Sequence, residues 1–414
     1  RFGFFPSIAV GYVVSNEKFF APIRDVVSMV KLKASYGLVG NDQIGGDRRF
    51  IYNETVIGGG KYYFGTTPSQ YTSVRLGEFP NPNVGWEKAK KLNLGADLSF
   101  FNQLNISVDY FKENREGIFL QRKSIPMYVG LSTKPWVNIG KMRNSGIDAS
   151  LEYHQPLGKD LHLTVRGNFT YARNRIMDQD EPDYAYTYMN HSGQMQWQKF
   201  GLVAAGLFQD QEDIDSWAKQ SFGEVKPGDI KYLDLNGDGI VDNYDTKPIG
   251  YSDIPEIVYG FGFSLQWKAF DLSAFFQGVA HVSFSTLTDQ TQAFVGRNLK
   301  ESSVFADLYG NTWTPENPGA KYPRMTTGAI DNNNQLSTFW MANGRYLRLK
   351  NLELGYTLPK RIANKIAMQS LRVYLSGVNL FTFSPFKLWD PDLQTGATNY
   401  PNNRIINLGL TIGF

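Results

Sequence analysis

The sequence contains no cysteine, no long hydrophobic run and no excess of one charge. The absence of cysteine excludes a fold held by disulfide bonds and metal sites built from thiolates. The longest apolar stretch, Leu202 to Phe208, is interrupted by Gly206 and falls far short of the ~18 to 20 residues that a membrane-spanning helix needs. Lys and Arg number 42 against 39 Asp and Glu, a formal net charge of +3. This balance excludes a protein that binds nucleic acid by neutralising phosphates.

What the chain has in abundance is alternation of apolar and polar residues. Two neighbouring segments, 92–100 and 104–110, place apolar side chains at every second position, and a short turn joins them into a hairpin with one apolar face. The same period of two recurs at 8–14, 30–38, 147–153, 161–171, 261–269, 272–276, 352–358 and 406–414, and more weakly near 346–349 and 371–380. We count about eleven strands, and a change of parity between Leu349 and Leu352 indicates a β-bulge.

The links between these strands alternate strictly between short and long. Short links lie near 15–27, 101–103, 155–160, 268–271 and 359–370, and long links near 41–85, 120–137, 174–257, 281–345 and 381–402. Short turns on one rim and long loops on the other are typical of an all-β transmembrane antiparallel β-barrel, with the turns in the periplasm and the loops outside. We predict apolar lipid-facing positions, a polar lumen and aromatic girdles at the strand ends, although aromatic residues also favour strands in general.

Both ends of the chain fit this interpretation. The sequence opens without the Met, basic region and apolar region of a signal peptide, and the alternation is under way by Ile8, so we expect residues 1–414 to be the C-terminal half of a longer barrel. Bacterial single-chain barrels have even strand numbers, so an odd count indicates that about as many strands precede Arg1. Phe414 ends the chain inside an amphipathic strand, as in outer-membrane proteins whose last strand is read by the barrel assembly machinery. We therefore expect Phe414 to be the assembly signal.

Several motifs, taken in order along the chain, resemble those of one family. They are Arg1-Phe2-Gly3-Phe4-Phe5-Pro6-Ser7, Leu32-Lys33-Ala34-Ser35-Tyr36-Gly37, Trp86-Glu87-Lys88, Asn144-Ser145-Gly146-Ile147, Pro227-Gly228-Asp229-Ile230, Tyr346-Leu347-Arg348-Leu349-Lys350-Asn351 and Gly377-Val378-Asn379-Leu380-Phe381. The whole chain is similar in this way to the SusC-like (RagA-like) TonB-dependent outer-membrane transporters of Bacteroidota. The resemblance implies a 22-stranded barrel with an internal plug, which imports glycan or peptide fragments. It also implies a SusD-like surface lipoprotein as lid and the TonB–ExbB–ExbD complex as partner, the latter through an N-terminal part outside this sequence.

An acidic segment at 234–245, inside the loop at 174–257, has the spacing of a calcium-binding loop. Oxygen side chains stand at positions 1, 3, 5 and 12, a glycine permits the sharp turn at position 6, and position 7 offers a backbone carbonyl. The candidate ligands are Asp234, Asn236, Asp238, Ile240, Asp242 and Asp245. We predict a structural calcium ion that folds the long loop. The alternative is a loop rich in Asx turns that is merely acidic.

Aromatic side chains in the long loops are candidate contacts for a ligand or a protein partner. They are Tyr184, Tyr186, Tyr188, Trp197, Trp313, Trp340 and Trp389. Such rings can stack on sugars or receive a peptide, but they can equally pack the loops onto each other or onto the lipoprotein. Polar residues of mixed charge would line the lumen or hold the plug, namely Asn93, Asp97, Asn105, Asp109, Asp148, Glu152, Arg166 and Asn168.

No set of residues suggests catalysis. The four histidines have no metal-binding spacing, and the Ser-x-x-Lys strings at Ser15 and Ser28 lack the Lys-Thr-Gly motif that accompanies them in penicillin-binding enzymes. We expect a transporter and not an enzyme. The alternative function is a barrel that only scaffolds a larger envelope assembly, such as secretion or barrel-insertion machinery. A TonB box and plug upstream would favour transport.

Overall fold

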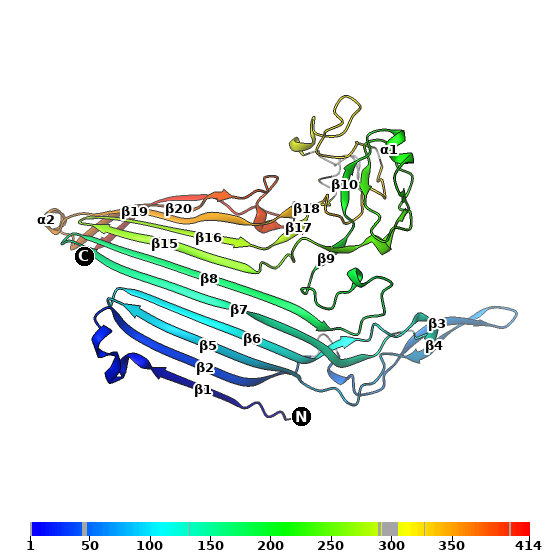
Figure 1. Ribbon diagram of the computed structural model, residues 1–414, viewed down its shortest axis with the longest axis horizontal. Coiled ribbons are helices and arrows are strands. Elements are labelled where there is room, and N and C mark those ends of the chain that lie inside the picture. Colours follow the sequence, from blue (N-terminus) through cyan, green and yellow to red (C-terminus); the bar gives the residue numbers. More distant parts are fainter. Residues whose placement is uncertain are drawn as a thin grey trace.

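Eleven strands form one antiparallel sheet in the computed structural model, which describes residues 2–43, 48–131, 133–288, 291, 305–326, 328–396 and 399–414 (Figure 1). The spatial order is β1-β2-β5-β6-β7-β8-β15-β16-β19-β20-β21, so each strand pairs with the next one of the sheet along the chain. The bounds are β1 Ser7–Val13, β2 Val27–Asn41, β5 Glu87–Phe100, β6 Leu104–Gln121, β7 Trp136–Leu157, β8 Leu161–Asp178, β15 Ile257–Trp267, β16 Phe270–Ala280, β19 Tyr346–Thr357, β20 Ser370–Phe383 and β21 Ile405–Gly413. The predicted all-β fold class and strand count are confirmed.

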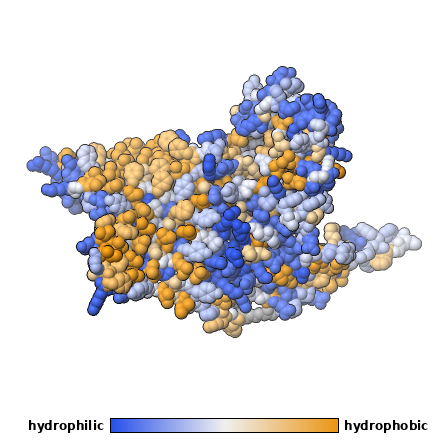
Figure 2. Space-filling model, in the orientation of Figure 1, coloured by the Kyte–Doolittle hydropathy of each residue, from blue (hydrophilic) through white to orange (hydrophobic). Residues whose placement is uncertain are grey.

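The register of the sheet separates an apolar face from a polar face. Val108 of β6 stands beside Ala149 of β7, and on the other side of the sheet Asp109 stands beside Asp148. Large side chains of the apolar face are not covered by other described parts of the chain, and Leu94 and Phe169 are 45% and 41% exposed. No layer of the described protein covers this face, as expected of a surface that contacts lipid. Hydrophobic residues gather toward the turn end of the strands (Figure 2).

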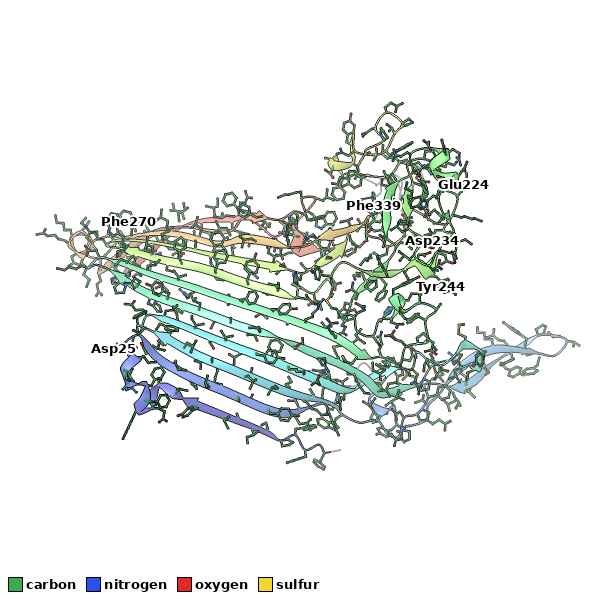
Figure 3. The ribbon with its side chains drawn as sticks, viewed as in Figure 1. Asp25, Glu224, Asp234, Tyr244, Phe270 and Phe339 are labelled. Carbon is green, nitrogen blue, oxygen red and sulfur yellow. The ribbon has the colours of Figure 1, made fainter. Side chains whose placement is uncertain are left out.

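Short turns and long loops lie at opposite ends of the strands. Asp25 and Phe270 mark the turn end, while Glu224, Asp234 and Phe339 lie at the loop end (Figure 3). The β5–β6 turn closes tightly, because Phe100 pairs with Leu104 and the residues between them include two with positive φ. The predicted sorting of connections is therefore confirmed.

The parity change in the sequence corresponds to a bulge within one continuous strand. β19 runs from Tyr346 to Thr357, and its pairing with β20 shifts register between Leu349 and Asn351. The extra residue restores the alternation, so that the side chains on either side of the bulge keep their faces. The predicted bulge is confirmed.

The loops carry small elements of their own. The two-stranded sheets are β3 Val56–Phe64 with β4 Ser69–Leu76, β9 Lys199–Gly201 with β14 Lys247–Ile249, β10 Ala204–Leu207 with β12 Ile230–Tyr232, β11 Lys219–Gln220 with β13 Ile240–Val241, and β17 Ser283–Ser285 with β18 Met341–Asn343. The α-helices are α1 Gln211–Asp215 and α2 Lys360–Ala363, and 3-10 helices occur at Val14–Asn16, Lys18–Ile23, Arg48–Phe50, Met127–Val129, Thr187–Met189, Asn243–Asp245, Ala306–Leu308, Asn364–Ile366 and Pro391–Leu393. In the described residues, no helix is long and apolar enough to cross a membrane.

The main buried core lies in the loops and not in the sheet. It is formed by Leu202, Leu207, Ile230, Tyr232, Val241, Leu308, Trp313, Tyr322 and Trp340. These residues come from the loop between β8 and β15 and the loop between β16 and β19. We call the described parts of these two loops, within 179–256 and 281–345, the loop assembly.

We predict that the two faces of the sheet differ sharply in their tolerance of charge. Leu151 lies on the apolar face near the middle of β7, and its neighbour Ser150 lies on the polar face. Leu151→Arg should destabilise the full-length protein by about 2 to 4 kcal/mol, because it puts a guanidinium into the hydrocarbon region. Ser150→Arg, the matched control, should leave stability nearly unchanged. Urea titration in lipid vesicles measures both, and equal losses in the two variants would contradict the assignment of faces.

Candidate functional site

A charged cluster joins three strands on the polar face. Lys33 of β2 places its Nζ 2.7 Å from a carboxylate oxygen of Asp97 in β5 and 3.3 Å from one of Asp109 in β6. The Ser107 hydroxyl donates to the same Asp97 oxygen at 2.7 Å. The polar residues predicted for the lumen share this face in the observed register, since Asp97 is aligned with Ser107, Asn105 with Glu152, and Glu152 with Arg166. Oppositely charged side chains of adjacent strands thus pair across β2, β5 and β6.

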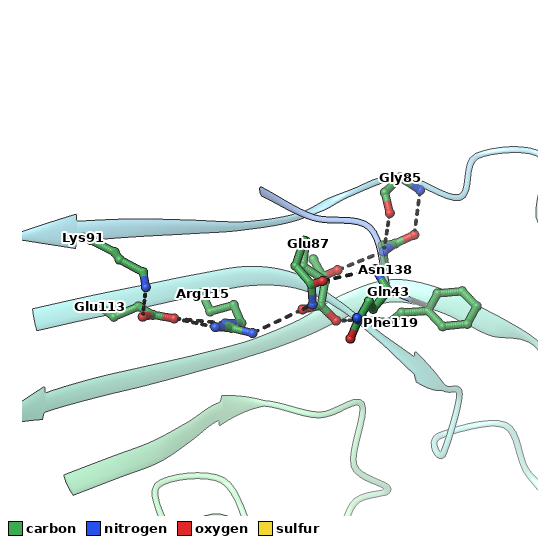
Figure 4. A network of polar contacts seen from close by, with 10 residues as sticks. Gln43, Gly85, Glu87, Lys91, Glu113, Arg115, Phe119 and Asn138 are labelled. Atoms are coloured by element: carbon green, nitrogen blue, oxygen red, sulfur yellow. Dashed lines mark hydrogen bonds and ion pairs between the residues drawn. The ribbon is translucent and has the colours of Figure 1, made fainter. Parts of the chain in front are cut away.

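A second network lies at the loop end of the same face (Figure 4). The Arg115 guanidinium bridges Glu113 at 2.8 Å and Glu87 at 3.4 Å, and Lys91 pairs with Glu113 at 3.1 Å. Glu87 is only 8% exposed and also accepts a hydrogen bond from the backbone N–H of Phe119. Burial of this carboxylate among donors holds the start of β5 against β6, where the first long loop returns to the sheet.

One amide fastens that loop to the sheet. The Asn138 side chain on β7 accepts a hydrogen bond from the Gly85 N–H at 2.9 Å and donates one to the Gly85 carbonyl at 3.1 Å. It also donates to the carbonyl of Gly117. The φ of Gly117 is +68°, a backbone conformation that glycine adopts at low steric cost. These contacts form a rigid base from which the β3–β4 hairpin projects (Figure 1).

The loop assembly is held by an ion pair between its two loops, in which the carboxylate is fully buried and the arginine partly exposed. Asp229 has no exposed surface, and its carboxylate meets the Arg324 guanidinium at 2.8 Å and accepts a hydrogen bond from Asn333 at 2.9 Å. The hydroxyl of Tyr232 donates to the carbonyl of Asn332 at 2.9 Å. The sequence analysis placed Asp229 within the motif Pro227-Gly228-Asp229-Ile230 but gave it no role of its own, and the further signal was a carboxylate directly before β12.

The last loop is held on the polar face by an arginine. Arg348 is 2% exposed and aligned with Gln277 of β16, and its guanidinium binds Asp390 and Asp392 of the loop between β20 and β21. It also donates to the Thr382 hydroxyl at 3.0 Å. The guanidinium offers several N–H donors to two carboxylates, and such charge-assisted hydrogen bonds are strong and directional. They therefore hold this loop against the polar face of the sheet. Sequence reasoning missed this clamp.

A cavity of about 670 Å³ opens between the loop assembly and the last loop. Its lining combines aromatic rings with charges, notably Phe305, Asp307, Lys321, Phe339, Phe386 and Lys387. Lys321, and then Tyr322, hold the pKa of Asp307 below its ordinary value, so this carboxylate stays ionised at neutral pH. Rings beside fixed charges of both signs suit a polar ligand that also has an apolar face.

The structure separates the predicted aromatic contacts into buried and accessible groups. Tyr186 and Tyr188 stack with their centroids 5.3 Å apart, Tyr184 stacks on His191, Trp197 is 61% exposed, and Trp389 stacks on Phe305. Trp313 and Trp340 are 9% and 2% exposed and belong to the loop core. For these two rings the structure favours the alternative that the loop aromatics pack the loops onto each other.

The candidate calcium loop folds as one closed unit. Asp245 is fully buried and accepts backbone hydrogen bonds from Leu235 at 2.6 Å and Asp242 at 2.8 Å, which ties position 12 to position 2. Asp234 accepts from the N–H groups of Gly237 and Gly239. In the part of the chain that the structure describes, no three His, Asp or Glu side chains gather closely enough to hold a metal ion. Calcium therefore stays a prediction.

The remaining loop residues lie around this unit. Asp238 accepts from the Ile240 N–H at 2.8 Å, and Asn236 donates to Asp238 at 3.0 Å. The Tyr188 hydroxyl donates to the Tyr244 carbonyl at 2.7 Å. Burial, and then the nearby carboxylates, raise the pKa of Tyr188. Two predictions made separately, the acidic loop and the tyrosine contacts, thus fall on one surface.

The assembly signal stays a prediction. Phe414 follows β21, the edge strand of the sheet, and its side chain is 82% exposed.

Comparison with known proteins points to one family. The family described as TonB dependent receptor-like, beta-barrel matches residues 2–380. Over its whole length the chain is 29% identical to TonB-dependent receptor P3 of Formosa agariphila and 26% identical to TonB-dependent receptor SusC of Bacteroides thetaiotaomicron. It spans 42% and 40% of the lengths of those two proteins.

Solved structures show the same fold. The structure of the RagAB peptide transporter superimposes on 99% of this chain with a TM-score of 0.73, at 22% sequence identity. This chain covers 43% of that one.

We predict that the buried pair at Asp229 keeps the two loops together. Asp229→Ala should cost the loop assembly about 3 to 5 kcal/mol, because Arg324 then keeps a charge without its partner. The expected result is faster protease cleavage between β8 and β15 with the barrel intact on heat-modifiability gels. Glu224→Ala, at a carboxylate whose side chain is 83% exposed, serves as the control and should not change cleavage. Equal cleavage of both variants would contradict the role of Asp229.

Proposed function

The chain belongs to the TonB dependent receptor-like β-barrel family, and we propose that the whole protein imports glycan or peptide fragments across the outer membrane in a TonB-dependent manner. Family membership confirms the predicted outer-membrane location and the resemblance to SusC-like proteins. The supporting observation is the cavity lined by Phe339 and Phe386, at the loop end of a polar wall. The relatives are named receptors and a transporter, and we propose no enzymatic activity.

The charges of the wall support a substrate that is neither a simple anion nor a simple cation. Lys31 and Lys33 together balance Asp97 and Asp109, and Lys91 and Arg115 together balance Glu87 and Glu113. Ion-selective pores instead carry rings of one sign. A wall of paired charges offers hydrogen bonds to hydroxyl or amide groups without trapping an ion, which suits sugar or peptide fragments. The choice between these two classes stays open.

The partners belong to the same proposal. A surface lipoprotein of the SusD type would close the loop end, and the TonB–ExbB–ExbD complex would act through a part of the protein outside this chain. The β3–β4 hairpin supports the first partner, because it projects from the barrel (Figure 1) and exposes Tyr62, Tyr63 and Phe64 at about 60% each. Exposed aromatic residues of this kind are enriched at protein interfaces.

We predict that the aromatic cavity contributes to uptake. In a strain that carries only the variant protein, Phe339→Ala with Phe386→Ala should raise the half-saturating concentration for uptake of the imported glycan or peptide roughly tenfold, since two stacking surfaces are lost. Tyr400→Ala, at an 80% exposed ring of the last loop, is the control and should behave as wild type.

A deletion strain tests the proposal as a whole. It should lose growth on at least one glycan or peptide source, and the loss should be reproduced by removing TonB. Unchanged growth on every source would contradict import and favour a scaffold.

We also propose that residues 234–245 bind a structural calcium ion. The spacing of the oxygen side chains and the glycines at positive φ, Gly237 and Gly239, support it. The carboxylates of Asp234 and Asp238 now accept backbone hydrogen bonds, and binding requires their remaining lone pairs to converge on the ion.

We predict that calcium protects this loop. Adding calcium to the full-length protein should slow proteolysis between β12 and β14, and Asp238→Ala should abolish the protection because one oxygen ligand is lost. Glu224→Ala should keep it. Equal rates of proteolysis with and without calcium in the wild-type protein would show that this loop does not bind calcium.

A further inference from the structure

The apolar face of the sheet changes abruptly into a basic surface near the loop end. The last uncharged row runs across the strands through Tyr110, Ile147 and Tyr171. The next two rows on the same face are Lys112, Ser145 and Arg173, and then Asn114, Arg143 and Arg175. Together, the side chains around Arg143, Ser145 and Arg175 line a hollow of about 370 Å³, bounded by the two tyrosines.

The depth of this hollow coincides with the membrane interface. Between Leu161 and Tyr171, β8 is roughly 33 Å long at about 3.3 Å per residue. At a tilt near 40° this stretch rises about 25 Å, the height of the apolar band of outer-membrane barrels. No Lys, Arg, Asp or Glu faces outward from β8 along it. The arginines therefore begin where the acyl chains of the outer leaflet end and the headgroups begin.

Two of the three arginines that line the hollow, and the adjacent Lys112, lack partners of opposite charge among the described residues. Within the described ranges of the chain, Arg143 donates only to the neutral Asn114 side chain at 3.0 Å, and Arg175 only to the Gly193 carbonyl at 3.1 Å. Lys112 has no ion pair among the described residues either. Arg173 alone is neutralised, by Glu256 at 2.9 Å.

Neighbouring charges at similar height behave differently. Lys90 of β5 faces the same side, and its ammonium pairs with Glu116 at 3.1 Å. In this row across the strands Lys90 therefore has an acidic partner, whereas Arg143 and Arg175, aligned with it through Asn114, have none among the described residues.

We propose that this hollow binds the phosphate-bearing headgroup of a lipid in the outer leaflet. Inside the hollow, the Arg143 and Arg175 guanidinium groups provide the planar forks that suit phosphate oxygens, and the Ser145 hydroxyl adds a donor. The Lys112 ammonium adds a point charge from the position aligned with Ser145 on β6. Tyr110 and Tyr171 lie below them, at the depth where aromatic residues border the hydrocarbon. The site would anchor the barrel to anionic lipid, independently of what the lumen transports.

The experiment uses the full-length protein in neutral detergent, titrated with short-chain phosphatidic acid and, separately, with diacylglycerol of the same tails. Wild type should bind phosphatidic acid, with an affinity that falls as salt rises, and should not bind diacylglycerol at the same concentrations. Arg143→Gln with Arg175→Gln should weaken binding roughly tenfold or more, because each basic residue near an anionic lipid contributes to the binding free energy. Lys90→Gln should bind as wild type. Heat-modifiability gels check that each variant is folded. If the double Gln variant misfolds, Arg143→Lys with Arg175→Lys replaces it in the test, and this variant should retain most of the affinity because it keeps the charge.

Three results would overturn the proposal. Equal affinity in the wild type and the double Gln variant would show that the arginines do not hold the headgroup. Full competition by inorganic phosphate at equal concentration would assign the hollow to free phosphate and not to lipid. A change in oligomeric state in the double Gln variant, without a change in lipid binding, would assign it to contact with a second copy.

Discussion

The register of the eleven-stranded sheet is the constraint on which the rest of the structure depends. In lipid every backbone N–H and C=O must be paired within the protein, so the strands must stay in continuous ladders. Because side chains alternate with period two, a slip of one residue would turn Leu151 inward and Ser150 outward along with every neighbour. The same register brings Lys33 of β2 to Asp97 and Asp109, and it aligns Arg143 with Arg175 on the opposite face.

The loops obey a different constraint, because they lie outside the membrane and must bury their apolar side chains against one another. The loop assembly has its own small core around Tyr232 and Trp340, and its two halves are joined through Asp229 and Arg324, 95 residues apart. A buried carboxylate is costly unless it is paired, so this contact specifies which loops meet. The clamp of Arg348 on Asp390 does the same for the last loop. The aromatic cavity exists because these three loops are fixed relative to one another.

Prediction from sequence succeeded where the pattern was local. The existence and order of the strands, the tight β5–β6 turn and the bulge in β19 all follow from alternation over a few residues, and the structure contains them. The predicted ranges 104–110 and 147–153 were too short, since β6 continues to Gln121 and β7 spans Trp136–Leu157. Prediction was incomplete for the loop aromatics. Trp197 and Trp313 have the same polar, loop-like surroundings in sequence, yet one is 61% exposed and the other is 9% exposed. Burial of an isolated ring depends on a partner segment far away in the chain, which has no local signature.

The amino-acid sequence by itself determined the fold class, the two faces of the wall and the family, because a period of two residues and the order of motifs are written along the chain. Only the tertiary structure decided which charges meet. Lys90 is neutralised by Glu116, whereas Arg143 and Arg175 have no carboxylate partner among the described residues, and nothing in their local sequence distinguishes the three. The reason is geometric: ion pairs in a sheet form between strands, at distances that the register sets and that spacing along one strand does not reveal.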